Sequence, residues 1–226
     1  MKKASEEVLA KQRAGHRDRI RARFMENGIS ALQTYEILEY LLFLLIPRRD
    51  VKPIAKSLLE NFNGLTGVLN ASAQELVDFG LTQRVAADLH FLHEMMCCLH
   101  LEKLKERPAL TDTRDVVDYL QNKLGHSAKE TLVVFYLDSG RKLLGVWEQC
   151  GTVNNAAVAP REVVEKALLL HAAGVILAHN HPSGNCKPSQ SDVDFTRTIY
   201  NALDLLGIQL LDHIIVTRDH YKSLMS

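Results

Sequence analysis

VILAHNHPSGNCKPSQSD, residues 175–192, joins a strand to a helix through a turn-rich loop. Its first four residues are wholly apolar, which is typical of a short strand buried on both faces of a sheet. Two prolines and a glycine follow, and a helix is predicted from about Ser189 to Leu206, closed by Gly207. A buried strand, a loop and a returning helix indicate an α/β fold.

The loop carries three candidate metal ligands. His179 and His181 stand at positions i and i+2, so an extended backbone directs both imidazoles to one side. Asp192 lies in the first turn of the following helix and can approach them. Two histidines and one carboxylate are the ligands of a catalytic zinc centre, in which the fourth position is left for water. The sequence therefore predicts one Zn²⁺ ion held by these three residues.

Two simpler interpretations stand beside this prediction. The pattern Ser189-x-x-Asp192 is also a capping box, so Asp192 could serve only the helix start. The two histidines could be polar groups with ordinary hydrogen-bond partners. Each fragment alone favours the simpler interpretation, whereas the combined spacing favours the metal.

Further strands and helices are predicted around this stretch. The β-rich runs 131–137 and 142–150 flank a turn at Asp138-Ser139-Gly140, and residues 208–217 form a last strand. Pro160 fits the first turn of a helix ending near Gly174. The first hundred residues are expected to be helical, with helices over about 34–46, 50–61 and 84–105. Thr34 is the expected N-cap of the first, and Ser72 with Glu75 forms a capping box.

Composition shifts near residues 103–112, where strand patterns begin. We therefore expect two domains, a helical one over 1–103 and an α/β one over 104–226. Whole-chain charge gives no argument for a nucleic-acid or membrane partner, because 27 Lys and Arg balance 27 Asp and Glu. The longest apolar run, Leu41 to Ile46, is too short for a membrane helix. The charged N-terminus and the absence of a disulfide pattern indicate the cytoplasm.

The motif His-x-His, seven residues, Ser, two residues, Asp resembles the JAMM (MPN+) zinc metalloprotease signature at every fixed position. The flanking sequences resemble the bacterial RadC family over essentially the whole chain, in the segments 15–17, 47–53, 160–163 and 179–184. This resemblance implies a JAMM/MPN (cytidine-deaminase-like) mixed sheet flanked by helices, behind a small all-α domain of helix-hairpin-helix character. It implies a zinc-dependent hydrolase of peptide or isopeptide bonds acting on a peptide or protein substrate.

The same resemblance implies two catalytic residues. JAMM enzymes use a glutamate on an earlier strand as general base and a serine near the oxyanion. Ser189 occupies the serine position, and Glu148, on the predicted strand 142–150, is the expected base. Glu162 is the alternative base, although an acidic residue at a helix start more often serves the helix dipole. Glu148 could also be only a solvated strand residue.

A second functional hypothesis is a DNA-associated protein of the RadC family whose zinc domain is structural or inactive. Arg17, Arg48, Arg49 and Lys52 are the candidate contacts to phosphate, and Gly80 stands where a helix-hairpin-helix has its hairpin. Charge runs are more often merely solvated.

Other functional classes are excluded by missing motifs. A zinc deaminase needs H-x-E followed by P-C-x-x-C, and other zinc proteases need HExxH; neither occurs. No P-loop or GxGxxG occurs, so no nucleotide cofactor is expected. One helical face carries a second set of candidate ligands, but a single helix cannot close a tetrahedral site; these are His90, His93, Cys97 and His100.

Overall fold

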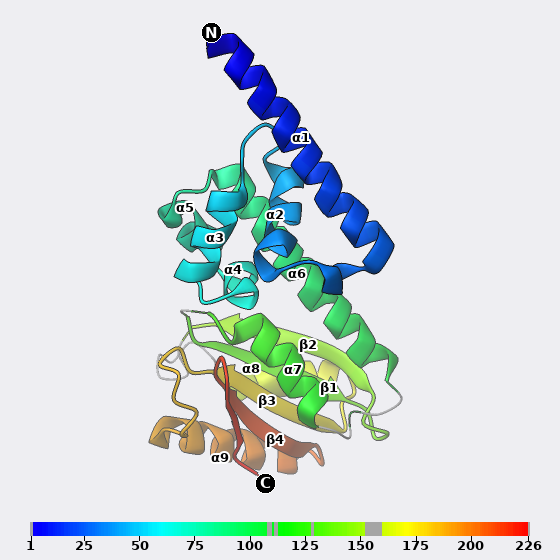
Figure 1. The fold of residues 1–226 in the computed structure, drawn as a ribbon. Helices are drawn as coiled ribbons and strands as arrows, with labels where there is room; N and C mark the ends of the chain where they lie inside the picture. Colours follow the sequence, from blue (N-terminus) through cyan, green and yellow to red (C-terminus); the bar gives the residue numbers. More distant parts are fainter. Residues whose placement is uncertain (1, 108–109, 111–112, 128, 152–159, 226) are drawn as a thin grey trace. The chain divides into compact units, whose positions relative to one another are not determined.

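A computed structural model describes the chain except residues 1, 108–109, 111–112, 128, 152–159 and 226, and it describes only the backbone of residues 2–14 (Figure 1). The expected junction over 103–112 therefore lies partly outside the described residues. Within the described residues, no helix has the length and apolar character needed to cross a membrane.

The chain divides into two compact units, Met1–Leu92 and His93–Ser226. Helix α6 (Gln83–Glu106) contributes residues to both, so this division falls inside a helix, and the expected domain bounds 1–103 and 104–226 stay a prediction. Whether the two parts fold independently stays a prediction.

The first unit is helical, as predicted. Its elements are α1 (Lys2–Asn27), a short 3₁₀ helix (Ile29–Ala31), α2 (Thr34–Leu45), α3 (Lys52–Asn61), α4 (Leu65–Asn70), α5 (Ala73–Phe79) and the first part of α6. The capping box of Ser72 and Glu75 is present at the start of α5. The N-cap of α2 is Gln33, and Thr34 is already helical, so that expectation was wrong by one residue.

The second unit is built on a mixed five-stranded sheet, as predicted. The strands are β1 (Thr131–Leu137), β2 (Leu143–Cys150), β3 (Gly174–Asn180), β4 (Gln209–Val216) and β5 (Tyr221–Ser223), in the order β2-β1-β3-β4-β5. Strands β3 and β4 are parallel, and the other neighbours are antiparallel. The crossover from β3 to β4 runs through α9 (Gln190–Asp204).

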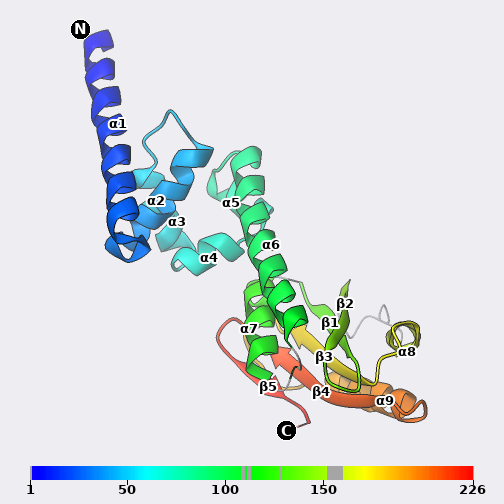
Figure 2. The same ribbon diagram turned by 90° about the vertical axis from the view of Figure 1, so that its right-hand side faces the viewer.

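Helices cover both faces of this sheet. One face packs against α7 (Thr113–Leu124), and the other packs against α9 and α8 (Pro160–Leu169) (Figures 1 and 2). Along β1, Val133 and Phe135 enter the core on the α7 side, whereas Leu132 and Val134 enter the core on the α9 side. Strands β1 and β3 are buried throughout because both their faces are covered, which explains their almost wholly apolar sequences.

Three features differ from the sequence-based expectations. Helix α7 was not predicted, although its apolar residues recur at helical spacing. Strand β5, at the edge of the sheet, was also missed. Helix α8 ends at Leu169 instead of near Gly174, because His171 adopts a left-handed conformation (φ 51°) that stops the helix.

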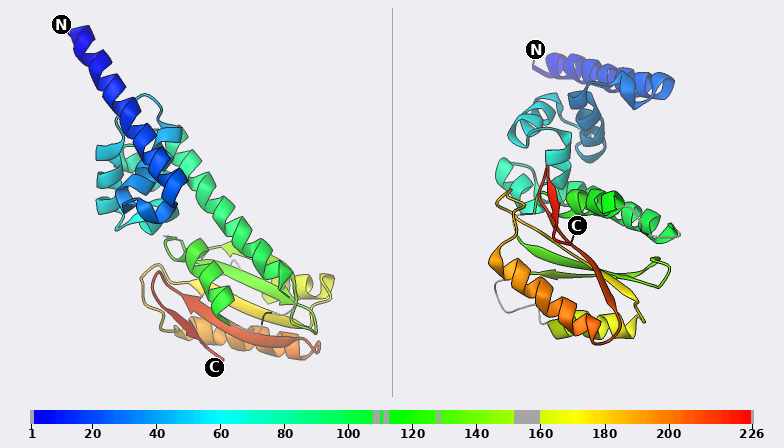
Figure 3. Two further views of the ribbon diagram at one scale, coloured as in Figure 1. Left: turned by 45° about the vertical axis from the view of Figure 1, so that its right-hand side comes forward. Right: turned by 90° about the horizontal axis from the view of Figure 1, so that it is seen from below.

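The topology brings three segments to one end of the sheet. Strand β1 runs antiparallel to β3, so the start of β1 lies beside the end of β3, with Leu132 opposite His179. Helix α9, which begins at Gln190 after the loop that follows β3, packs on one face of the sheet (Figure 3). Leu177 of β3 enters the core on this face, and strand alternation directs His179 to the same side. The candidate ligands lie at this meeting point.

Candidate metal centre

Four potential metal-ligating side chains converge where β1, β3 and α9 meet. They are Glu130, His179, His181 and Asp192, and one ligand atom from each lies within 4.8 Å of the others. The three ligands predicted from sequence are therefore brought together. Among the described residues, no other group of three or more such side chains converges in this way.

The Nε2 atoms of the two histidines face each other. His179 is fully buried at the end of β3, and His181 directly follows the strand, where its amide donates to the carbonyl of Val216. Their Nε2 atoms are 3.0 Å apart. The Nδ1 of His181 lies 2.7 Å from the carbonyl of Asn185, which can only accept, so Nδ1 carries the proton and Nε2 offers a lone pair.

Asp192 is held on the opposite side of the same space. Its oxygen Oδ2 accepts from both the amide and the hydroxyl of Ser189, each at 2.7 Å, and the Asp192 amide donates back to the Ser189 hydroxyl. The capping box predicted as an alternative to the metal site is thus present, and it aims the carboxylate at the histidines. Both interpretations describe the same residue.

Electrostatics favour an ionised Asp192. Burial raises the pKa of its carboxyl, but the interaction with His179 and the hydrogen bonds from Ser189 outweigh burial and hold the pKa well below its usual range. A buried carboxylate that stays ionised is suited to binding a cation.

The distances fit a small divalent cation. A tetrahedral zinc ion with bonds of about 2.0–2.1 Å holds its donor atoms roughly 3.3 Å apart. The Nε2 atoms of His179 and His181 lie 3.3 and 3.4 Å from the nearest carboxylate oxygens of Asp192, beside their own separation of 3.0 Å. Oδ1 faces His179 and Oδ2 faces His181, so the two nitrogens and the carboxylate lie at about the separations of donor atoms around such an ion.

Glu130 is the fourth member, and the sequence analysis missed it. It directly precedes β1, is half-buried, and accepts the Gly151 amide at its main-chain carbonyl. The signal that could have found it is topological: it is the acidic residue at the start of the strand that pairs with the His179 strand.

Asn180, between the two histidines, fixes the segment that carries Glu130. Its side chain alternates to the other side of the strand. There Oδ1 accepts from the Thr131 amide at 2.8 Å, and Nδ2 donates to the carbonyls of Ser127 and Lys129 at 3.3 and 3.1 Å. One amide side chain therefore links the histidine strand to both sides of Glu130.

His179 also has a buried partner on its far side. Its Nδ1 lies 2.9 Å from Nε2 of His213 on β4, and Nδ1 of His213 lies 2.5 Å from Oγ1 of Thr196 on α9. Burial lowers the pKa of His213 to about 3, with a further lowering from the charge of His179.

Glu148 does not reach the centre, and the expectation that it is the general base is corrected. It pairs with Val133, whose side chain enters the core on the α7 side, so Glu148 faces away from His179. Its carboxylate lies 3.2 Å from Nζ of Lys123 and accepts from the Tyr119 hydroxyl at 3.4 Å, both on α7. Strand alternation decides to which face of the sheet Glu148 points. The sequence of β2 did not reveal which of its residues point to the α7 side and which to the side of His179.

Glu162, the alternative base, is exposed in the first turn of α8 and is not a member of the convergent group. Ser189 is beside the centre, where its hydroxyl donates to Asp192. A role for Ser189 at an oxyanion stays a prediction.

A groove of ≈ 550 Å³ lies along α9. Pro188 and Val193, which flank the segment of Ser189 and Asp192, line it together with Thr196. It continues between α9 and β5 past the half-exposed Tyr200 and the cationic residue Arg197. Its volume is in the range of ligand-binding clefts in proteins.

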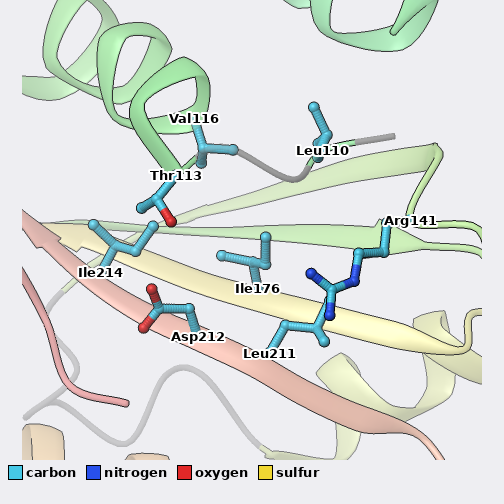
Figure 4. A pocket seen from close by; sticks show the side chains of 8 residues that line it. All are labelled: Leu110, Thr113, Val116, Arg141, Ile176, Leu211, Asp212 and Ile214. Carbon is cyan, nitrogen blue, oxygen red and sulfur yellow. The ribbon is translucent and has the colours of Figure 1, made fainter. Parts of the chain in front are cut away.

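A second, smaller hollow of ≈ 80 Å³ lies on the α7 side of the sheet (Figure 4). Asp212 and Arg141 are its charged residues, on a floor formed by Ile176, Leu211 and Ile214. The Asp212 carboxylate already accepts from the His213 amide and the Ser223 hydroxyl. This hollow contains none of the convergent ligands.

The candidate phosphate contacts in the first unit differ in their surroundings. Arg17 donates to the carbonyls of Ile46, Pro47 and Arg49 and stacks on Phe43, so its guanidinium stabilises the end of α2. The side chains of Arg48 and Arg49 are exposed. The Nζ atom of Lys52 lies 5.2 Å from the ring centroid of Tyr35.

The histidine and cysteine face of α6 shows a hydrogen-bonded pair instead of a metal set. Sγ of Cys97 lies 3.6 Å from Nε2 of His93, and both side chains are buried. Burial raises the pKa of the Cys97 thiol to about 11, which disfavours the thiolate that a metal requires.

Comparison with known proteins connects the sequence of this chain to a protein family. A family model described as a RadC-like JAB domain matches residues 110–226. The chain is 41% identical over 203 residues to the UPF0758 protein SPO0054 of Ruegeria pomeroyi, covering 89% of this chain and 91% of that protein. It is 39% identical over 224 residues to the UPF0758 protein FN0909 of Fusobacterium nucleatum, covering 95% and 97% respectively.

Proposed function

The chain belongs to the RadC family, and from that premise and the geometry of the centre we propose that it is a zinc-dependent hydrolase of peptide or isopeptide bonds. The observation that carries the proposal is the convergence of two imidazoles and two carboxylates within 4.8 Å at one end of the sheet. His179, His181 and Asp192 hold the ion, which leaves Glu130 for proton transfer.

Zinc is the metal we assign because two nitrogen ligands and one carboxylate suit it, whereas magnesium and calcium prefer oxygen ligands. A zinc ion bound there supplies a lowered pKa for a coordinated water and a positive charge that polarises a carbonyl.

The protein's own groups supply the remaining chemistry. Glu130 lies within reach of the ligands, so its carboxylate can accept a proton from the attacking water and return it to the leaving amine. Asn180 fixes the backbone on both sides of Glu130 and thereby its position. Ser189 holds Asp192 in its ligating orientation. These assignments replace Glu148 as the base.

The groove beside the centre supports a chain-like substrate. It starts at Pro188 and Val193, next to the ligands, and extends along α9 to Tyr200, Arg197 and the edge-strand residue Lys222. We assign it to the part of a peptide or protein substrate that lies beside the scissile bond. Aromatic and basic walls favour a segment with apolar and acidic side chains.

The cytoplasm is the compartment we propose. All four cysteines, Cys97, Cys98, Cys150 and Cys186, are free thiols, which is typical of proteins from a reducing environment.

A direct test measures zinc and cleavage separately. The purified full-length protein should contain one zinc by elemental analysis and should cleave members of a fluorogenic peptide library, with cleavage lost on chelation and restored by zinc. Asp192→Asn should lower both zinc content and cleavage. A zinc-loaded protein that cleaves neither peptides nor an isopeptide-linked substrate contradicts the hydrolase proposal.

DNA binding is the second candidate function, and the exposed pair Arg48 and Arg49 is the observation that favours it. Neutralising both should reduce salt-dependent DNA affinity while leaving zinc content unchanged. Arg17 is a poor choice for that test, because its removal affects the end of α2.

A further inference from the structure

The two histidine ligands are oriented in different ways. His181 has its Nδ1 on a main-chain carbonyl, that of Asn185, which fixes its tautomer directly. His179 has its Nδ1 on another imidazole, that of His213, at 2.9 Å. A pair of imidazoles does not by itself determine which ring carries the proton between them.

The hydrogen bonds of Thr196, which contacts the other side of His213, determine which ring carries the proton. Oγ1 of Thr196 lies 2.5 Å from the main-chain carbonyl of Asp192, and a carbonyl only accepts. The Thr196 hydroxyl therefore donates there, and its oxygen accepts from the Nδ1–H of His213 at 2.5 Å. The Nε2 of His213 then carries a lone pair and accepts from the Nδ1–H of His179.

We propose that His213 and Thr196 are positioning residues that hold His179 in the tautomer whose Nε2 lone pair faces the metal, before any metal binds. The inference rests on the proposed function, since it takes the cluster to be a metal centre. His213 touches neither substrate nor ion; it acts through His179. Both rings are fully buried, so water does not compete for these nitrogens.

The chain of bonds also ties the ligands to one another. It starts at a ligand on β3, crosses His213 on β4, and returns through Thr196 to the main chain of Asp192, a second ligand, on α9. The neighbour of His213, Asp212, points to the other face of the sheet, where it lines the smaller hollow (Figure 4). We call the hydrogen bonds from His179 through His213 and Thr196 to Asp192 the relay. Within β4, the relay therefore depends on His213 alone.

The opposite direction of the relay defines the competing state. In it Thr196 donates to His213, His213 donates to His179, and the Nε2–H of His179 points to Asp192, 3.3 Å away. That state has no lone pair for a metal, and zinc could bind only after the protons along the relay had moved. The two directions make opposite predictions for the metal-free protein.

The first experiment reads the tautomer in metal-free, full-length protein at neutral pH. Long-range ¹H–¹⁵N correlation spectra, assigned by replacing each histidine in turn, should show Nδ1–H on His179 and on His213. An Nε2–H tautomer of His179 in the wild-type protein overturns the proposal.

The second experiment measures zinc affinity by competition with a chelator. Thr196→Val, which keeps the shape and removes the hydroxyl, should weaken zinc binding about 10–100-fold, the usual effect of losing an outer-shell partner. Thr196→Ser should restore it. His213→Leu should weaken binding similarly, whereas His213→Gln, which retains an acceptor for the Nδ1–H of His179, should recover most of it.

Thermal unfolding of each metal-free variant separates lost orientation from lost structure. Thr196→Val with wild-type unfolding and unchanged zinc affinity overturns the proposal. A wild-type protein that binds no zinc contradicts the proposed function instead, and the metal-free spectrum still reports the tautomer on its own.

Discussion

The side-chain oxygen of Asn180 accepts a hydrogen bond of 2.8 Å from the main-chain amide of Thr131. Asn180, the last residue of β3, stands between the candidate ligands His179 and His181, and Thr131 follows Glu130 at the start of β1. The segment that carries two of the candidate ligands thus also fixes the residue that we assign to proton transfer.

Asn180→Asp should separate zinc binding from the positioning of Glu130. The aspartate keeps the acceptor for Thr131 but cannot donate to the carbonyls of Ser127 and Lys129, so the Glu130 segment loses two of its bonds. We expect zinc content to stay at one ion per chain while kcat falls about 10²-fold, the effect of a misplaced catalytic group. Zinc analysis with steady-state kinetics checks this; equal losses of zinc and kcat would contradict it.

Glu130→Gln should retain zinc and lose turnover. The amide keeps the shape of the side chain but cannot accept a proton, so kcat should drop by the ~10²–10⁴-fold typical of acid–base catalysis. Glu162→Gln, in an exposed position on α8, is the matched control and should leave kcat unchanged. Loss of zinc from the Glu130→Gln protein would show that Glu130 is a fourth ligand.

Glu148→Gln should affect stability slightly and turnover not at all. The side chain is 36% exposed and contacts Lys123 and Tyr119 on the far face of the sheet, so the expected change in unfolding free energy is under about 1 kcal/mol. Denaturant unfolding and peptide cleavage measure the two quantities. A large fall in kcat with zinc retained would restore Glu148 as the base and refute the position assigned to it here.

Tyr200→Ala should raise KM and leave kcat and zinc content unchanged. Tyr200 lines the groove and is not a member of the convergent group, so its loss should remove binding that is equal in the ground and transition states. A roughly 10-fold rise in KM corresponds to ~1.4 kcal/mol. Leu205→Ala, at the highly exposed end of α9 and outside the groove lining, is the control. If both variants keep the wild-type KM, the substrate does not occupy this groove.

Arg17→Ala should destabilise the helical unit. The guanidinium donates to the carbonyls of Ile46 and Arg49 in the connection that follows α2, and we expect a loss of about 1–3 kcal/mol. Arg17→Lys should recover only part of it, because an ammonium lacks the planar fork. Urea unfolding of both variants, followed by circular dichroism, tests this. Unchanged stability in Arg17→Ala with reduced DNA affinity would favour the phosphate-contact role.

The sequence by itself determined the helical first unit, the α/β second unit and the three predicted ligands. Local signals carry that information: an apolar run marks β3, i and i+2 spacing directs His179 and His181 to one side, and the Ser189 capping box places Asp192 at a helix start. Only the tertiary structure decided which glutamate joins them. Glu148 and Glu130 lie on neighbouring strand segments, and the pairing of β2 with β1 and of β1 with β3 sends the first to the α7 side and the second to the metal centre. The His213 relay is hidden from sequence for the same reason, since strand register, which long-range packing sets, brings β4 beside β3.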